Sequence, residues 1–280
     1  MRCQWQELLN LLPIWLRQPV DEQGREDLQE LRLRIDHRPE LVMKNHSVRL
    51  NRHVCQDDLN YILNTSTRYS PWTSGSILQG FVTASGGHRI GLCGDCVYDG
   101  DKLKNIQLLT SVCVRVAREY AGISQNLSQL TGSVLIIGKP GSGKTTLLRD
   151  LICCISDNGS GAVAVLDERR ELFPLSNGKY FFHRGIRTDV LSGCKKAAGL
   201  DMAIRTLNPQ VIALDEITCA EDCDALAHAA WCGVTLLATA HAGSREELFA
   251  RKVYKPVLEN RIFNTLVILH SDQTWRKEAM

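Results

Sequence analysis

GKPGSGKT, residues 138–145, matches the pattern G-x-x-x-x-G-K-[ST] at every fixed position. The apolar run 133–137 (SVLII) predicts a strand before it, and TTLLRDLI (145–152) predicts a helix after it. Glycines let backbone N–H groups wrap around a phosphate, and the start of the helix adds the positive end of its dipole. With this context the segment predicts a phosphate-binding loop rather than a chance glycine-rich turn.

The side chains of this loop predict that it binds ATP together with Mg²⁺. Lys144 would neutralise the β- and γ-phosphates, and Thr145 would offer its hydroxyl to Mg²⁺. The N-K-x-D motif that reads guanine does not occur in the sequence, which argues against a GTPase switch. The residues expected to contact the nucleotide are Gly138, Lys139, Pro140, Gly141, Ser142, Gly143, Lys144, Thr145 and Thr146.

A second candidate element is VIALDE (211–216), an apolar run that ends in two carboxylates. A buried parallel strand delivers its carboxyl end to the crevice where α/β sheets bind ligands. There Asp215 would hold Mg²⁺ through water, and Glu216 would accept a proton from the attacking water or orient it. Taken alone, the two acids could equally cap the next loop.

The second half of the chain alternates apolar and amphipathic segments. Continuous apolar runs are typical of strands buried on both faces, so this alternation predicts a parallel sheet with helices on both sides. Ser244 followed by Glu247 is a capping box that predicts a helix start. The expected strands are 133–137, 162–166, 210–214, 234–239 and 265–269, and the expected helices are 143–156, 194–207, 221–231 and 245–258.

The first ~125 residues predict a smaller α+β domain. Residues 121–131 are polar and contain Gly122, which makes them the candidate linker. The predicted domains are 1–125, for oligomerisation or partner docking, and 126–280, for ATP hydrolysis. Within the first domain the expected helices are 5–16, 56–64 and 71–80, and the expected strands are 30–35, 40–43, 88–92, 104–108 and 112–117.

Composition argues against several classes of protein. A net charge of +2 over 280 residues gives no support to a nucleic-acid-binding surface, and no apolar run approaches the length of a transmembrane segment. The chain is therefore expected to be cytoplasmic. Its 11 cysteines are scattered, and Cys93 and Cys96 have the spacing of half a zinc or redox site without a matching second pair. Reduced thiols are the expected state.

The last strand before the C-terminal helix ends in Ala238-Thr239-Ala240-His241. This arrangement resembles the additional-strand, catalytic-glutamate branch of RecA-like P-loop ATPases, in which a later strand lies beside the P-loop strand. The resemblance implies that Thr239 and His241 sense the γ-phosphate. Without it, His241 would be interpreted as an ordinary core or loop histidine.

Three further side chains are candidate catalytic groups. Glu168, in the acidic segment 167–171 after the second strand, could approach the nucleotide or the catalytic water, or could lie in a solvated loop. Arg187 and Arg205, and also Arg184, are candidates for an arginine that reaches the γ-phosphate of a neighbouring subunit, although each could equally be a surface arginine.

Taken together, the sequence resembles the stage III sporulation protein AA family of endospore-forming bacteria, which is akin to the hexameric ATPases of type II and type IV secretion and of pilus assembly. The resemblance covers nearly the whole chain. It is carried by ELRLRIDHRPELV (30–42), GHRIGLCG (87–94), VCVRVARE (112–119), GKPGSGKTTLLRDL (138–151), VLDERREL (165–172), the block 185–217 and LLATAHAGS (236–244).

The resemblance implies a hexameric, Mg²⁺-dependent ATPase motor in the mother-cell cytoplasm. The motor would dock at the membrane on proteins of the sporulation stage III channel complex, which links mother cell and forespore. By position, the acidic box of the secretion ATPases falls on residues 167–171 and their histidine box on His241. Asp215-Glu216 stands where the secretion ATPases usually have Gly-Glu, and this favours the sporulation branch.

Two alternatives remain open at this stage. A nucleic-acid-dependent ATPase of the recombinase or helicase kind would share the core fold. The near-neutral charge and the lack of an aromatic–basic stripe count against it. A nucleotide switch in which hydrolysis is incidental is the other alternative.

Overall fold

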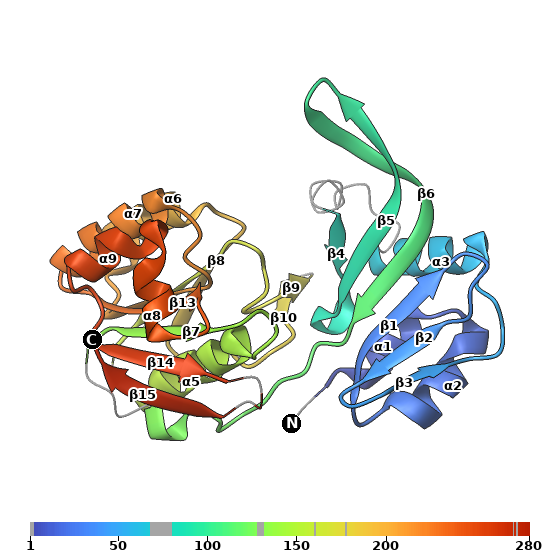
Figure 1. Cartoon of the computed structure of the whole chain (residues 1–280), viewed down its shortest axis with the longest axis horizontal. Helices are drawn as coiled ribbons and strands as arrows, with labels where there is room; N and C mark the ends of the chain where they lie inside the picture. Colours follow the sequence, from blue (N-terminus) through green and yellow to red (C-terminus); the bar gives the residue numbers. More distant parts are fainter. Residues whose placement is uncertain are drawn as a thin grey trace. The chain divides into compact units, whose positions relative to one another are not determined.

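The structure is a computed structural model that describes residues 3–67, 80–127, 132–159, 161–176, 178–270, 272 and 274–280. The chain forms two compact units, each with its own hydrophobic core. One unit comprises Met1–Glu119 with Pro174–Phe181, and the other comprises Tyr120–Phe173 with Phe182–Met280 (Figure 1). The predicted fold class, a parallel-sheet α/β core preceded by a smaller α+β unit, is confirmed.

The first unit is built on an antiparallel sheet with the strand order β3-β2-β1-β6-β5-β4. In β1 the alternation of leucine and arginine buries Leu31 and Leu33, while Arg32 and Arg34 lie on the exposed face. The buried face packs against the helices. The elements are α1 (Trp5–Leu11), α2 (Ile14–Gly24), β1 (Leu28–Arg34), β2 (Glu40–Met43), β3 (Ser47–Arg49), α3 (Gln56–Thr67), β4 (Phe81–Thr83), β5 (Arg89–Asp99) and β6 (Lys102–Arg115).

Two predictions for this unit were wrong in detail. The single helix expected over 5–16 is divided into α1 and α2, because the residue before a proline is disfavoured in the helical region and Leu12 is extended before Pro13. The strands expected at 104–108 and 112–117 form one strand, β6, in which Leu108 adopts a positive φ of 43°. Of the helix expected over 71–80, residues 71–79 lie outside the described residues, and Gly80 is part of a turn.

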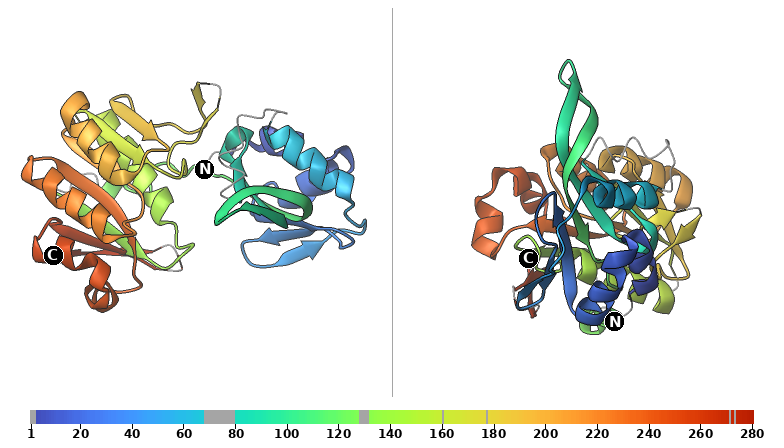
Figure 2. Two further views of the ribbon diagram at one scale, coloured as in Figure 1. Left: turned by 90° about the horizontal axis from the view of Figure 1, so that it is seen from above. Right: turned by 90° about the vertical axis from the view of Figure 1, so that its right-hand side faces the viewer.

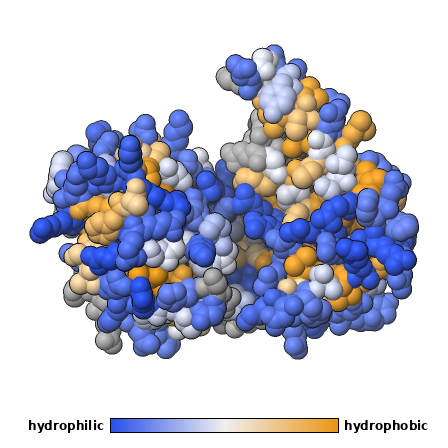
Figure 3. Space-filling view, in the orientation of Figure 1, coloured by the Kyte–Doolittle hydropathy of each residue, from blue (hydrophilic) through white to orange (hydrophobic). Residues whose placement is uncertain are grey.

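The β5–β6 hairpin projects beyond the rest of the first unit (Figure 1 and Figure 2, right). Apolar side chains lie along the projecting part on the face seen in Figure 3, and Tyr98 and Leu108 are exposed. Cys93 and Cys96 are both exposed on β5. Across the described ranges, no cluster of three or more potential metal-ligating side chains is found.

The second unit contains a seven-stranded sheet with the order β11-β8-β12-β13-β7-β14-β15. All neighbouring strands are parallel except β14 and β15. One face packs on α6, α7 and α9, and α5 covers the other (Figure 2, left). The elements are β7 (Val134–Gly138), α5 (Lys144–Asn158), β8 (Val163–Asp167), β11 (Thr188–Ser192), α6 (Lys196–Leu207), β12 (Val211–Leu214), α7 (Ala220–Trp231), β13 (Thr235–His241), α8 (Arg245–Ala250), α9 (Lys255–Glu259), β14 (Thr265–Leu269) and β15 (Trp275–Ala279).

Strand β13 lies between β12 and β7, as the additional-strand arrangement predicted. The edge strands β11 and β15 were not predicted. The helix expected over 245–258 is also divided, into α8 and α9, with Arg251 extended between them. Pro256 lies in the first turn of α9, where its missing N–H has no helical partner to lose, whereas in the interior of one long helix it would be unfavourable.

None of the described helices combines the length and the apolar composition needed to cross a bilayer.

His88 is a fully buried histidine that ties together distant parts of the first unit. Its Nδ1 accepts the Ala117 N–H at 3.1 Å, and its Nε2 lies 3.2 Å from the Gln4 carbonyl oxygen. These two contacts require the neutral tautomer with the proton on Nε2. Burial lowers the pKa of His88 to about 4.

We therefore predict that acidification destabilises this unit through His88. In the unfolded chain His88 takes up a proton near pH 6.5, whereas in the folded unit it does so only near pH 4. The contribution of neutral His88 to the free energy of unfolding is therefore complete above pH 6.5 and is lost as pH falls to 4. The loss amounts to about 3 kcal/mol. Urea unfolding of the wild type and of His88→Gln at pH 7, 5.5 and 4 measures it. A constant difference between the two proteins across this range would contradict the prediction.

Candidate active site

The phosphate-binding loop predicted at 138–145 connects β7 to α5. Gly143 precedes the helix with a φ of 98°, a conformation that side chains with a Cβ rarely adopt. A Cβ on Gly138 would lie 2.8 Å from the carbonyl oxygen of Leu269 in the neighbouring strand. Glycine is thus required at both positions, once for backbone conformation and once for close packing of the sheet.

Lys144 is held at the centre of this loop. Its Nζ lies 2.9 Å from the Gly138 carbonyl oxygen, 3.0 Å from that of Lys139 and 3.0 Å from Nδ1 of His241. Burial lowers the pKa of Lys144, an effect that the nearby carboxylates Asp215 and Glu216 oppose. A buried ammonium with carbonyl acceptors is a strong local positive charge, suited to an anionic ligand.

Asp215 connects three elements at the carboxyl edge of the sheet. Thr145 Oγ1 donates to Asp215 Oδ2 at 2.9 Å, and Thr239 Oγ1 donates to Asp215 Oδ1 at 2.7 Å. The Thr239 hydroxyl also accepts the backbone N–H of Glu216 at 2.8 Å. The P-loop helix, β12 and β13 therefore meet through one carboxylate and two hydroxyls.

Glu216 is the residue that follows Asp215, and its backbone adopts a positive φ of 43°. Such a conformation costs a non-glycine residue about 1–3 kcal/mol and occurs often at functional sites. Its carboxylate lies between two basic side chains: Oε1 is 3.1 Å from His241 Nε2, and Oε2 is 3.0 Å from Arg169. The turn thus directs the carboxylate along the same edge as the P-loop.

His241 joins Lys144 to Glu216. Nδ1 accepts from the lysine, so the ring proton is on Nε2 and is donated to the glutamate. The backbone N–H of His241 is 3.3 Å from the Tyr254 hydroxyl, which accepts it. A hydrogen-bonded chain therefore runs from the ammonium through one imidazole to the candidate base.

The acidic segment after β8 is organised by Asp167, which is buried and accepts the backbone N–H groups of Glu171, Leu172 and Phe173. Burial raises its pKa to about 6, although the N–H donors oppose the shift. Glu168 is paired with Lys196 at 2.6 Å. The catalytic role predicted for Glu168 stays a prediction.

The candidate arginines lie elsewhere in this unit. Arg205 is exposed and pairs with Asp201 one turn earlier in α6. Arg187 donates to the carbonyl oxygen of Ser156, and Arg184 to that of Thr188. Ser156 is about 18 Å along α5 from Lys144 at the usual helical rise. Within one chain, then, neither Arg187 nor Arg205 belongs to the Lys144–His241–Glu216 group, and a role towards a neighbouring subunit stays a prediction.

The residues present fit a magnesium ion. Thr145 and Asp215 bring a hydroxyl and a carboxylate together, and Mg²⁺ in nucleotide sites is held by one or two such oxygens together with phosphates and water.

Several residues that support this site were not predicted from the sequence. Arg169 pairs with Glu216, and Tyr254 supports the backbone of His241. Arg149, buried on α5, donates to the carbonyl oxygens of Glu171 and Leu172 and so fixes the acidic segment. Arg169 belongs to the segment of mixed charge at 167–171 that the sequence indicates as a candidate, whereas no sequence motif indicates Tyr254 or Arg149.

The Thr239 hydroxyl can be tested apart from any ligand. Thr239→Val keeps the shape of the side chain but leaves the Glu216 N–H without its acceptor and Asp215 Oδ1 without the hydroxyl donor, while Thr145 still donates to Oδ2. We expect it to lower the free energy of unfolding by about 1–3 kcal/mol. Thr239→Ser should retain most of the stability, and Thr235→Val, on the same strand, serves as the matched control. Equal urea midpoints for Thr239→Val and the wild type would refute the assignment.

The sequence of this chain matches a known protein family. The family model described as "Sporulation stage III, protein AA" matches residues 2–277. Stage III sporulation protein AA of Bacillus subtilis (strain 168) is 35% identical over 255 residues, which cover 88% of this chain and 83% of that protein.

Two solved structures show the same fold. The pilus retraction motor PilT, solved with bound ADP, has a TM-score of 0.60 at 14% identity and covers 90% of this chain and 76% of its own. The Legionella pneumophila ATPase DotB has a TM-score of 0.58 at 15% identity and covers 95% and 79%. The chain thus shares its fold with the pilus retraction motor PilT and the ATPase DotB. Given the family match and the Bacillus relative, the chain belongs to the stage III sporulation protein AA family.

Proposed function

We propose that this protein is a Mg²⁺-dependent ATPase that works as a secretion-type motor during sporulation. The observation that carries the proposal is the hydrogen-bonded chain Lys144–His241–Glu216, which joins the phosphate-binding loop to a carboxylate at the same edge of the sheet. Hydrolysis of a phosphoanhydride needs a cation that binds the phosphates and a base that accepts a proton from water. Here Lys144 and Glu216 would have these roles, and His241 connects them.

In the proposed reaction, water attacks the γ-phosphorus of ATP and the bond to the β–γ bridging oxygen breaks, giving ADP and phosphate. Glu216 accepts the proton of the attacking water. Lys144 neutralises charge on the β- and γ-phosphates. Thr239 and His241 hold Asp215 and Glu216 in position relative to the phosphate-binding loop. Thr145 and Asp215 would hold Mg²⁺, which supplies further neutralisation of phosphate charge when bound.

The relatives support the motor and its setting. PilT, which has a similar fold, is described as a pilus retraction motor and was solved with ADP bound. The Bacillus relative is named as a sporulation protein. We infer a hexameric ring located in the mother-cell cytoplasm and attached to the membrane through proteins of the stage III channel complex. Arg187 and Arg205 remain the proposed sources of an arginine that reaches the neighbouring subunit's nucleotide.

Two substitutions separate binding from catalysis. Lys144→Ala should abolish saturable ATP binding and hydrolysis, because the phosphate charge loses its partner. Glu216→Gln should bind nucleotide but hydrolyse it about 10²–10⁴-fold more slowly, because the amide cannot accept the proton. Steady-state phosphate release and binding of a fluorescent ATP analogue provide the two measurements.

Lys255→Ala and Glu259→Gln are matched controls, because they remove the same charges from an exposed ion pair on α9 that includes no proposed site residue. Both should behave as the wild type. A folded wild type that hydrolyses no ATP under any condition that allows assembly would overturn the proposal. Hydrolysis that depends on single-stranded DNA, with a steep decrease as salt rises, would favour a nucleic-acid-dependent ATPase instead.

Ring formation is tested by the mass in solution. With a non-hydrolysable ATP analogue and Mg²⁺, we expect a species of about six times the chain mass of 31.3 kDa. Light scattering after size-exclusion chromatography, with and without the analogue, measures it. A monomer under all these conditions, including reconstitution with the membrane partners, would contradict the ring.

A further inference from the structure

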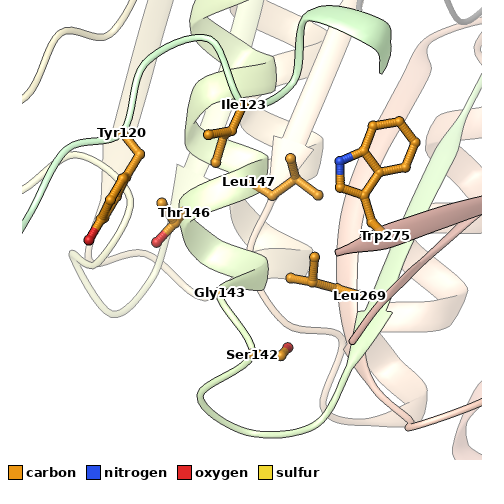
Figure 4. Close-up of a pocket in the computed structure, with 8 residues that line it drawn as sticks. All are labelled: Tyr120, Ile123, Ser142, Gly143, Thr146, Leu147, Leu269 and Trp275. Carbon is orange, nitrogen blue, oxygen red and sulfur yellow. The ribbon is translucent and has the colours of Figure 1, made fainter. Parts of the chain in front are cut away.

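A cavity of about 310 Å³ adjoins the phosphate-binding loop in the second unit (Figure 4). This volume lies at the lower end of the range typical of small-molecule sites, roughly 300–1,000 Å³. One side of the cavity is formed by the loop and the first turn of α5. The other walls come from the segment before β7 and from the β14–β15 hairpin, through Tyr120, Ile123, Leu269 and Trp275.

The segment before β7 is fixed in place by one buried carboxylate. Asp150 of α5 accepts the Gly122 N–H at 2.8 Å, and the Ser124 N–H and hydroxyl at 2.7 Å each. These three bonds hold the segment against the flank of α5 and present Tyr120 and Ile123 beside the loop. Trp275 is positioned by its antiparallel pairing with Leu269. Hydrogen bonds to the backbone thus position the two segments that carry Tyr120, Ile123 and Trp275.

Most of the walls are apolar or aromatic, and the loop side adds the hydroxyls of Ser142 and Thr146. No charged side chain occurs among the described residues that line the cavity. Ile123 and Tyr120 are large apolar side chains that remain 40% and 39% exposed at this position. In Figure 4 the Trp275 indole lies beside Leu269, with its nitrogen on the side that faces Leu147. Such a surface suits a flat, weakly polar ring, and the indole N–H offers it one hydrogen bond.

The position of the cavity relative to the loop indicates which part of a nucleotide it would take. Successive helical residues are turned by about 100°. Thr145 faces Asp215 on the side of the metal and the candidate base, while Thr146 lines the cavity on the other side. A nucleotide whose terminal phosphates lie at Lys144 and Thr145 would therefore extend past Thr146 into the apolar walls.

From this arrangement we propose that the cavity is the base-binding subsite of the nucleotide. It holds a purine ring by apolar and stacking contact, with Trp275 as the main base-contacting residue and Ile123 as the second. The proposal rests on the proposed ATPase function. The positive charge of Lys144 in the loop complements the phosphates of the ligand. The apolar walls of the cavity add affinity only for ligands that carry a base.

Calorimetric titration of the full-length protein with Mg²⁺ and either ADP or tripolyphosphate tests this division. Trp275→Ala should weaken ADP binding about 5- to 100-fold, the usual effect of removing a base-stacking aromatic side chain. Tripolyphosphate binding should be unchanged, because that ligand has no base. Trp275→Phe should restore most of the affinity for ADP. Trp231→Ala is the matched control, since Trp231 is a 75% exposed tryptophan of α7 in the same unit.

Ile123→Ala is a second variant with little risk to folding, because Ile123 is already partly exposed. It should weaken ADP binding about 3- to 10-fold without affecting tripolyphosphate. Wild-type ADP affinity in both folded variants would overturn the subsite and leave the ATPase proposal intact, and so would an equal loss for both ligands. A folded wild type that binds neither ligand would instead refute the proposed function.

Discussion

The site depends on the insertion of β13 between β12 and β7. Parallel pairing sets Ala238 beside Leu214 and His241 beside Gly138, so the end of β13 lies next to both the Asp215-Glu216 turn and the phosphate-binding loop. Since the carboxyl ends of parallel strands meet at one edge of a sheet, a single strand placement brings the lysine, the histidine and both carboxylates together.

Charge is balanced locally along this edge. The ammonium of Lys144 and the guanidinium of Arg169 lie at the two ends of a group whose middle is formed by His241 and Glu216. Burial alone would disfavour the charged lysine, and two backbone carbonyl oxygens and the nearby carboxylates offset that cost. The strained turn at Glu216 is supported by the Thr239 hydroxyl, which binds the Glu216 N–H.

Two buried aspartates fix the loops around the P-loop helix in the same way. Asp167, at the end of β8, gathers the N–H groups of the acidic segment, and Asp150, on α5, gathers those of the segment that leads into β7. A carboxylate can accept several N–H groups at once, so one short side chain orders a whole turn. The environment of the nucleotide loop is therefore set by backbone hydrogen bonds on both sides.

The P-loop, the Asp215-Glu216 turn, the parallel core and the family could be predicted from the sequence, because glycine positions, apolar runs and motif spacing are local properties of the chain. Folding, in contrast, sets the pairing of Glu168 with Lys196 and of Arg169 with Glu216. It also brings Trp275, which is remote from the P-loop in sequence, to the cavity beside that loop. Such contacts depend on which strands are neighbours in the sheet. They also depend on which of several equally charged groups a long side chain contacts, and no periodicity in the sequence predicts that partner.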